Sequence, residues 1–402
     1  MKTIIILADG AADEPIAALG DKTPLQVAKK PYIDLLAAQG KSGELDTIPV
    51  GFKPGSEIAN LSVLGYDVPK VFEGRGSLEA ASMGIDIDAD EIAMRCNLIC
   101  IEDGKIKNHS AGHISSEEAK ELMLFLDEKL NDGIVSFYPG VSYRHLLKMK
   151  NGSKNLDCTP PHDVAGASFK SVLIKGNDAE AQATADYLND LILTSQKLLE
   201  NHPVNQKRIA EGKDPANSIW PWSPGFRPRM ETLQELYGIN SGSVISAVDL
   251  IMGIGVYAGL KPIHVEGATG LFDTNYEGKA RAAIDALKKD DFVYLHIEAP
   301  DEAGHEGDYK LKIKTIEDID SRVVKTIYEE TKDWDEPVTI ALLPDHPTPC
   351  DLKTHTNRPI PFLIYRPDEV GDSVQVYDEF ESPKGDYGLI RGNTFMKLLF
   401  GK

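Results

Sequence analysis

The sequence predicts an α/β fold, in which a mainly parallel sheet carries helices on both faces and a smaller α+β domain is inserted into it. Short apolar runs alternate with helical patterns through most of the chain, as they do in strand–helix–strand units. Residues 85–178 do not follow this alternation and contain short strand patterns and one clear helix. A chain of 402 residues also exceeds the usual size of a single core, so two domains are expected.

The elements of the main domain can be placed in chain order. The first strand is expected at Thr3–Ala8. A helix is expected at Thr23–Gln39, because Thr23 is a good N-cap, Pro24 suits the first helical position and Gly40 ends the pattern. A shorter helical pattern covers Glu57–Leu64. The C-terminal part repeats the alternation, with strands at Phe292–Ile297, Val338–Leu343 and Phe362–Tyr365 and a helix at Asp308–Thr331.

The middle stretch is interpreted as an inserted domain. It holds the strand pattern Ala93–Ile101 and the helix Ser116–Leu130, which a capping-box pattern precedes. The long helix Ala179–Glu200 is expected to return the chain to the first domain, and residues 201–225 are expected to form a polar, proline-rich connection. We therefore predict one discontinuous domain from residues 1–84 and 179–402, and a second domain from residues 85–178.

Charge and composition argue against several classes of function. The net charge is −20 and no run rich in Lys or Arg is present, so nucleic acids and anionic membranes are poor partners. No apolar stretch reaches 18 residues, and the N-terminal apolar run ends at Asp9, which fits neither a spanning helix nor a signal peptide. Four scattered cysteines favour free thiols in a reducing cytoplasm. None of these patterns predicts an oligomeric state.

Metal-type ligands follow the probable strands at four widely separated places. The carboxyl ends of strands are where ligands collect in α/β sheets. Carboxylate and imidazole together suit divalent Mn, Mg, Co or Zn. Two such ions would also neutralise the crowded carboxylates of "YLHIEAPDEAGHEGD" at residues 294–308. Each of these residue spacings is common by itself, so the prediction rests on finding ligand-type residues at all four places. The candidate ligands are Asp9, Asp301, His305, Asp345, His346 and His355.

A candidate nucleophile stands in "GFKPGSEIANLSVLGYD". Ser56 follows Pro-Gly and opens a helical pattern, a place where serine is usually a plain N-cap. The same position has a functional interpretation, because the free N–H groups and the positive dipole end of the helix would stabilise a phosphate on the hydroxyl. A bound metal would favour the alkoxide.

These residues resemble a known family. Asp9, a serine at a helix start, D-x-x-x-H, D-H and H-T in this order resemble the alkaline phosphatase superfamily, whose sheet the main domain is expected to share. More narrowly, the chain resembles the archaeal-type cofactor-independent (2,3-bisphosphoglycerate-independent) phosphoglycerate mutases over essentially its whole length. The stretches that carry this resemblance are "ADGAAD", "GSEIANLSVLGYD", "GRGSLEAASMGI", "ISAVDLIMGIG", "GATG", "APDEAGHEGD", "PDHPTP" and "THT".

The resemblance implies a metal-dependent isomerase of glycolysis that interconverts 3-phosphoglycerate and 2-phosphoglycerate without bisphosphoglycerate. Ser56 would take the phosphoryl group as phosphoserine and return it to the other hydroxyl of the glycerate. The inserted domain would act as a lid and bind the substrate. The implied ligands are Asp301, His305 and His355 for one metal ion, and Asp9, Ser56, Asp345 and His346 for the other.

Substrate-binding candidates come from the inserted domain and its junction. Arginine is the best donor for a planar anion such as a carboxylate, although each of these side chains could equally lie in solvent. His296, inside a strand pattern, is interpreted as a core histidine, and Trp220 and Trp222 as core or pocket wall. The substrate-binding candidates are Arg75, Arg95, Asn97, Arg144 and His162.

One departure from the family pattern leaves the substrate open. Archaeal-type mutases often carry a lysine where this chain has Met252 in "VDLIMGIG". A branch of the family is proposed to phosphorylate homoserine, so a homoserine kinase-like phosphotransferase that makes O-phosphohomoserine is the alternative. No P-loop or kinase glycine loop is present, so its donor would have to act through Ser56 and the metals. A metal-dependent phosphatase and a non-catalytic binding protein are further alternatives.

Overall fold

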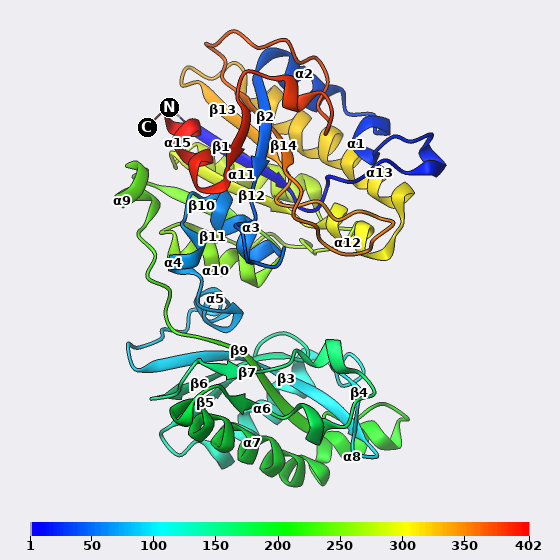
Figure 1. Ribbon diagram of the computed structural model, residues 1–402, viewed down its shortest axis with the longest axis vertical. Coiled ribbons are helices and arrows are strands. Elements are labelled where there is room, and N and C mark those ends of the chain that lie inside the picture. Colours follow the sequence, from blue (N-terminus) through cyan, green and yellow to red (C-terminus); the bar gives the residue numbers. More distant parts are fainter. Residues whose placement is uncertain (1, 402) are drawn as a thin grey trace. The chain divides into compact units, whose positions relative to one another are not determined.

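The computed structural model of the protein describes residues 2–401. Two compact units are present, Met1–Phe72 with Arg229–Lys402, and Glu73–Pro228. Figure 1 shows a sheet with helices in the first unit and a smaller sheet with helices in the second, so the α/β prediction is confirmed. No helix within residues 2–401 has an apolar run long enough to cross a membrane.

The first unit is built on an eight-stranded sheet in the order β11-β10-β12-β1-β13-β14-β2-β15. Only β14 runs antiparallel to its neighbours. The central strands β1, β12 and β13 are buried along nearly their whole length, which explains their unbroken apolar sequences. The strands are β1 Lys2–Ala8, β2 Lys41–Asp46, β10 Gly242–Ile245, β11 Lys261–Ile263, β12 Phe292–Ile297, β13 Val338–Leu343, β14 Ile360–Tyr365 and β15 Gly388–Arg391.

Helices cover both faces of this sheet. Ile4 and Ile6 of β1 share a core with apolar side chains of α2, α11, α13 and α14 on one face. On the other face, α3 approaches β12 at Tyr294 and α10 packs on β10 at Val244. The helices are α1 Pro24–Val27, α2 Pro31–Gln39, α3 Ser56–Val63, α4 Val68–Val71, α9 Leu233–Tyr237, α10 Asp249–Tyr257, α11 Tyr276–Leu287, α12 Ala299–Glu306, α13 Tyr309–Asp318, α14 Lys325–Thr331 and α15 Phe395–Phe400.

One helix predicted as continuous is interrupted. The predicted helix Thr23–Gln39 is α1 and α2, because Pro31 cannot donate to a helical bond and disfavours helical backbone at Lys30. The predicted helix Asp308–Thr331 is continuous from Tyr309 to Thr331, with a π-helical turn at Ile319–Val324 between α13 and α14. Hydrophobic periodicity reveals neither the break nor the π-helical turn.

The π-helical turn has a structural role, because it places Asp320 at the start of α2. Asp320 Oδ1 accepts hydrogen bonds from the backbone N–H groups of Tyr32 (2.9 Å) and Ile33 (2.7 Å). Burial raises the pKa of Asp320 to about 6, against about 3.9 in an unfolded chain. Between these values the folded protein keeps a proton that the unfolded chain releases, so this group lowers stability as the pH rises through this window.

We expect Asp320→Asn to increase the free energy of unfolding at neutral pH by about 1–3 kcal/mol, because the amide oxygen still accepts and no charge is buried. The gain should vanish below about pH 4, where the carboxyl is neutral in both states. Urea unfolding at several pH values measures this, with the exposed Asp333→Asn as the control. A gain that is the same at all pH values would contradict the explanation by burial.

The second unit has a five-stranded antiparallel sheet with β3 at its centre, and a small β7–β8 ladder. The strands are β3 Glu91–Glu102, β4 Lys105–Asn108, β5 Val135–Tyr138, β6 Arg144–Lys150, β7 Leu156–Asp157, β8 Lys175–Gly176 and β9 Ser218–Gly225. The helices are α5 Arg75–Ser82, α6 Ser116–Leu130, α7 Ala179–Glu200 and α8 Pro203–Ala210. Helices α6 and α7 share a core with one face of β3, through side chains such as Met94 and Cys96.

This unit extends beyond the predicted residues 85–178 at both ends. At its start, α5 packs so closely on β3 that a Cβ on Gly76 would lie 2.5 Å from the Ala93 carbonyl oxygen. At its end, α7 shares the core of the unit, and residues 201–225 form α8 and β9 where we expected a polar connection. Pro221 in β9 made this strand hard to predict, because proline is rare inside sheets.

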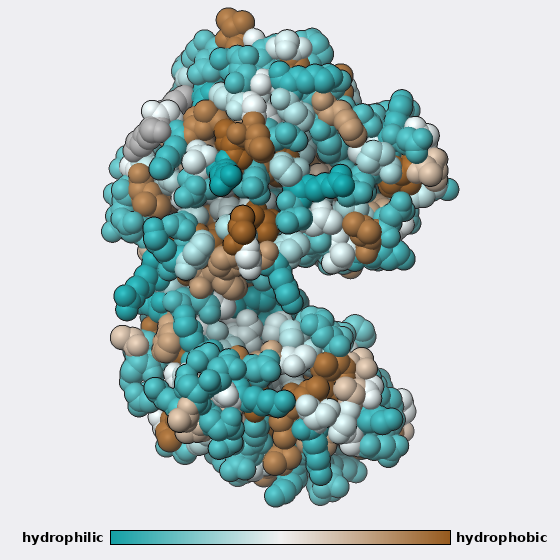
Figure 2. All heavy atoms as spheres, in the orientation of Figure 1, coloured by the Kyte–Doolittle hydropathy of each residue, from teal (hydrophilic) through white to brown (hydrophobic). Residues whose placement is uncertain are grey.

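Hydrophilic side chains predominate on the surface shown in Figure 2, with apolar residues scattered among them. Such single exposed apolar residues are ordinary, and they include Val50 and Val370. All four cysteines are free.

Candidate metal centre and nucleophile

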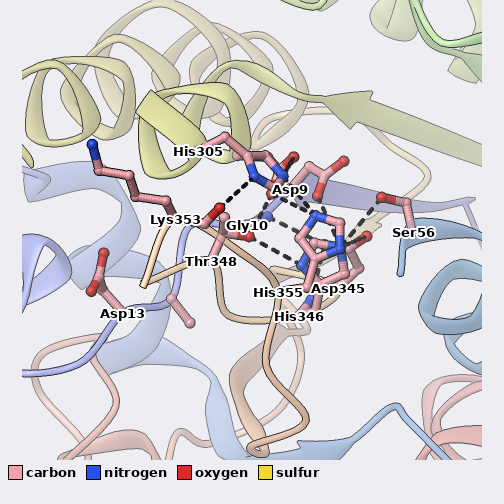
Figure 3. A network of polar contacts seen from close by, with 12 residues as sticks. Asp9, Gly10, Asp13, Ser56, His305, Asp345, His346, Thr348, Lys353 and His355 are labelled. Atoms are coloured by element: carbon pink, nitrogen blue, oxygen red, sulfur yellow. Dashed lines mark hydrogen bonds and ion pairs between the residues drawn. The ribbon is translucent and has the colours of Figure 1, made fainter. Parts of the chain in front are cut away.

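The ligand segments predicted from the sequence meet at one edge of the sheet in the first unit (Figure 3). Asp9 follows β1, Asp345 and His346 follow β13, and α12, which begins just after β12, carries Asp301 and His305. Strand β1 lies parallel between β12 and β13, so the carboxyl ends of all three strands are neighbours. The fold therefore brings Asp9 Oδ1 within 3.7 Å of His346 Nε2, although most of the chain separates the two residues.

Asp301, His305 and His355 form the first cluster. His305 Nε2 lies 3.3 Å from Asp301 Oδ2, and His355 Nε2 lies 3.5 Å from Asp301 Oδ1. His305 Nδ1 donates to the Lys353 carbonyl oxygen at 3.1 Å, which leaves Nε2 directed at the other two side chains. The two Nε2 atoms are only 2.8 Å apart, a distance at which they must share a proton or face a common cation.

Asp9, Asp345 and His346 form the second cluster, beside Ser56. His346 Nε2 lies 3.7 Å from Asp9 Oδ1, 3.5 Å from Asp345 Oδ2 and 3.3 Å from Ser56 Oγ. Ligand atoms of Asp9, Asp345 and His346 lie within 4.8 Å of one another, as do those of Asp301, His346 and His355. His346 is thus within reach of both clusters.

Both clusters fit metal ions. Asp9 Oδ1 is buried and has no hydrogen-bond partner among residues 2–401. Burial and the nearby charges of Asp345 and Asp301 raise the pKa of Asp9 well above its usual range. Burial alone would raise the pKa of Asp301 too, but hydrogen bonds to His305 and His355 hold it well below the usual range. Carboxylates buried this closely are costly unless a cation compensates them, and the donor set suits Mn, Mg, Co or Zn.

Ser56 is the first residue of α3. The N-cap is Gly55, which makes no side-chain cap, so Ser56 does not have the ordinary capping role. Asn60, one turn later, donates its amide to the Ser56 carbonyl oxygen (2.8 Å) and to Asp345 Oδ2 (2.9 Å). The buried Tyr294 hydroxyl donates to Asn60 Oδ1 at 2.5 Å and fixes the orientation of this amide. Asn60 and Tyr294 were missed because they look like ordinary helix and strand residues in the sequence.

His296 is the buried core histidine that the sequence predicted, and it also holds Asp9. Its Nε2 lies 2.9 Å from Asp9 Oδ2, and its Nδ1 lies 3.1 Å from Ser246 Oγ. The Asp9 carboxylate can only accept, so His296 Nε2 carries a proton and donates it to Asp9. Burial lowers the pKa of His296 to about 3, so the ring is neutral and its Nδ1 accepts from the Ser246 hydroxyl, whose oxygen accepts from Val248 N–H.

Lys312 in α13 is a further residue that the sequence did not reveal. Its ammonium is fully buried and donates to Asp13 Oδ2 (2.8 Å), Thr348 O (2.9 Å) and Ala12 O (3.1 Å). One lysine thereby ties together the loops that follow β1 and β13. In the sequence it is one of several lysines on an amphipathic helix, so no local signal marks it.

The substrate-binding candidates lie together within the second unit. Arg95 and Asn97 lie on the same face of β3, away from the face that α6 and α7 cover. Arg144 of β6 is opposite Asn97, and Trp222 of β9 is opposite Arg95. The Trp222 ring also contacts His162, with ring centroids 5.6 Å apart, and its Nε1–H donates to Asn97 Oδ1.

This group concentrates positive charge. The Arg95 guanidinium lies 4.7 Å from the Trp222 ring, and its Nε lies 3.2 Å from the Glu79 carboxylate. Burial lowers the pKa of Arg95, Glu79 opposes this change, and the charges of Arg75 and Arg144 lower the pKa further. Guanidinium groups gathered in this way favour an anion such as a carboxylate or a phosphate.

The fold and these clusters define a class of α/β protein in which a serine at a helix start lies among candidate carboxylate and imidazole metal ligands at the end of a mainly parallel sheet. Comparison with known proteins narrows this class. A family model for 2,3-bisphosphoglycerate-independent phosphoglycerate mutase matches residues 37–205. A protein of that name from Methanosarcina acetivorans is 52% identical over 99% of both chains. A probable mutase of this kind from Geobacter sulfurreducens is 47% identical over 100% of both chains.

Solved structures have a similar fold. A protein from Pyrococcus horikoshii matches 100% of this chain and 96% of its own with a TM-score of 0.84 and 30% identity. The cofactor-independent phosphoglycerate mutase of Thermoplasma acidophilum matches 100% of this chain and 99% of its own, with a TM-score of 0.70 and 27% identity. The chain therefore belongs to the family of 2,3-bisphosphoglycerate-independent phosphoglycerate mutases, as the sequence resemblance predicted.

Proposed function

We propose that this protein interconverts 3-phosphoglycerate and 2-phosphoglycerate through a phosphoserine at Ser56, without a bisphosphoglycerate cofactor. The observation that carries the proposal is the position of Ser56, whose Oγ lies 3.3 Å from His346 Nε2 at the start of α3. In the first transfer a bond forms between Ser56 Oγ and phosphorus while the bond from phosphorus to one glycerate oxygen breaks; Ser56 loses its hydroxyl proton and that glycerate oxygen gains one. In the second transfer the bond from phosphorus to Ser56 Oγ breaks and a bond to the other glycerate oxygen forms; that oxygen loses its proton and Ser56 regains one.

The proposed metal ligands are those that the family resemblance implies. Two bound divalent ions would stabilise the serine alkoxide and the negative charge of the phosphoryl group. Mn, Mg, Co and Zn all suit carboxylate and imidazole ligands. One set consists of Asp301, His305 and His355, and the other of Asp9, Ser56, Asp345 and His346.

The chain itself orients the reacting groups. Ser56 opens α3, and the positive end of the helix dipole favours a phosphoryl group on its hydroxyl. Asn60 fixes the backbone of Ser56 against Asp345. His296 and Lys312 hold the loop that carries Asp9.

We assign the carboxylate of the substrate to the guanidinium groups of the second unit. Their planar, bidentate geometry matches a carboxylate, and the stacking of Arg95 on Trp222 fixes one of them in place. The function of this unit as a lid stays a prediction. We place the reaction in the cytoplasm, where four unpaired cysteines are stable. The residues in this assignment are Arg75, Arg95, Asn97, Arg144 and His162.

The test supplies purified protein with 3-phosphoglycerate and Mn²⁺, without bisphosphoglycerate, and couples any product to enolase. We expect 2-phosphoglycerate to form. A parallel reaction supplies homoserine and ATP, the alternative that the named relatives do not favour. Phosphohomoserine without 2-phosphoglycerate would contradict the proposal, and release of inorganic phosphate alone would indicate a phosphatase.

A further inference from the structure

Thr348 lies between the two ligand clusters (Figure 3). Its side chain is fully buried in the loop that follows β13. Its Oγ1 lies 2.5 Å from Asp301 Oδ1 and 3.3 Å from His346 Nδ1. Asp301 belongs to the first cluster and His346 to the second, so a single hydroxyl contacts a proposed ligand of each metal ion.

The hydrogen-bond directions in this contact follow from the groups themselves. An ionised carboxylate only accepts, so the Thr348 hydroxyl donates its one proton to Asp301. The hydroxyl oxygen then accepts from His346, which places the ring proton on Nδ1. His346 Nε2 keeps its lone pair, and this atom faces Ser56 and Asp9. The result is a directed chain from His346 through Thr348 to Asp301.

The position of Thr348 is fixed from several sides. Its backbone N–H donates to the Ala12 carbonyl oxygen at 3.2 Å, and its own carbonyl oxygen accepts from the buried Lys312 ammonium. Helix α12 approaches so closely that a Cβ on Gly304 would lie 2.3 Å from Thr348 O and 2.9 Å from its Cγ2. With its backbone and methyl group confined, the hydroxyl is held between its two partners.

We propose that Thr348 is a positioning residue that couples the two metal sites of the proposed function, on which this inference rests. An ion held by Asp301 fixes that carboxylate, and therefore the direction of the Thr348 hydroxyl. The hydroxyl in turn keeps His346 in the tautomer whose Nε2 is free to bind the other ion. Binding of an ion at either site thus raises the affinity of the other site for its ion. Thermodynamic linkage makes this effect the same in both directions.

Other residues around the clusters do not explain such coupling equally well. Asn60 holds a ligand of the second set only, and so does His296. The His346 and His355 rings lie 3.9 Å apart and offer a second route between the sets. A variant that removes the Thr348 hydroxyl and keeps this ring contact therefore separates the two routes.

The experiment titrates metal-free protein with Mn²⁺ by isothermal calorimetry. We expect the unaltered protein to bind two ions cooperatively. Thr348→Val, which keeps the shape and loses the hydroxyl, should weaken both sites by about 10- to 100-fold and abolish the cooperativity. Thr348→Ser keeps the hydroxyl and loses only the methyl group that confines it, so it should retain most of the affinity and the cooperativity. Thr331→Val is the matched control, because that buried hydroxyl donates within α14, to Ile327 O, and contacts neither cluster among the described residues.

A Thr348→Val isotherm like that of the unaltered protein, or one in which a single site is weakened, would overturn the coupling. Histidine ¹⁵N NMR of the unaltered, metal-free protein gives a second test that needs no variant. It should place the ring proton of His346 on Nδ1, and a proton on Nε2 alone would refute the chain of hydrogen bonds. Failure of the unaltered protein to bind Mn²⁺ would instead contradict the proposed function, and the coupling with it.

Discussion

Ser56→Ala is expected to abolish phosphoryl transfer, with a loss of about 10⁴-fold or more in kcat. The hydroxyl of Ser56 is the group that forms the bond to phosphorus, and an alanine at the start of α3 leaves only water as an acceptor. The helix itself should persist, because Ser56 is not its N-cap and alanine is a good helix former. The assay is the conversion of 3-phosphoglycerate, together with rapid quenching and mass spectrometry to detect phosphoserine at position 56.

Ser62→Ala on the same helix is the matched control for this variant. Ser62 is buried at the other end of α3, and its substitution should leave both turnover and phosphoserine formation in place. Continued transfer by Ser56→Ala would show that another group accepts the phosphoryl group. A phosphorylated peptide that does not contain residue 56 would lead to the same conclusion.

The sequence predicted which residues the fold collects because it revealed where strands end. The residues after β1, β12 and β13 were expected at one edge once the sheet was recognised as mainly parallel, since parallel strands share one carboxyl edge. The structure adds that β1 lies between β12 and β13, which makes these residues neighbours. His355 was predicted because it lies just before the last core strand. That strand, β14, runs antiparallel to β13, so its start lies at the carboxyl edge of β13. The structure places His355 Nε2 2.8 Å from that of His305.

Residues that position the ligands could not be predicted in the same way. Thr348, Asn60 and Lys312 act through long-range contacts, and neither their residue types nor their spacing distinguishes them from other loop or helix residues. The first and last residues of the second unit could not be predicted either, because α5 and α7 have ordinary helical patterns. Only their packing on β3 shows to which core they belong.

We expect the candidate metal centre to lower the stability of the metal-free protein. Asp9, Asp345 and Asp301 bring carboxylates together in a buried place, and the raised pKa of Asp9 reflects its burial and the charges of the other two. Each bound ion would offset this cost. At an ion concentration about 1,000 times the Kd, binding adds about 4 kcal/mol per site to the free energy of unfolding.

Asp9→Asn should therefore change stability in opposite directions with and without metal. In the metal-free protein we expect it to raise the free energy of unfolding by about 1–3 kcal/mol, because it removes a buried charge while its amide oxygen still accepts from His296. With Mn²⁺ present the variant should be the less stable protein and should lose transfer by about 10³-fold or more, because it lacks a ligand. Thermal unfolding with EDTA and with Mn²⁺ measures both effects.

Asp13→Asn, four residues away in the same loop, is the informative contrast. Asp13 is also buried, but its carboxylate neutralises the Lys312 ammonium at 2.8 Å. Removing its charge leaves a buried cation unpaired, so we expect a loss of about 3–5 kcal/mol both with EDTA and with Mn²⁺. The two variants thus compare a buried carboxylate that would need a bound metal ion with one that a lysine already neutralises. Equal destabilisation of the metal-free protein by both variants would show that the Asp9 cluster is already neutralised without a metal ion.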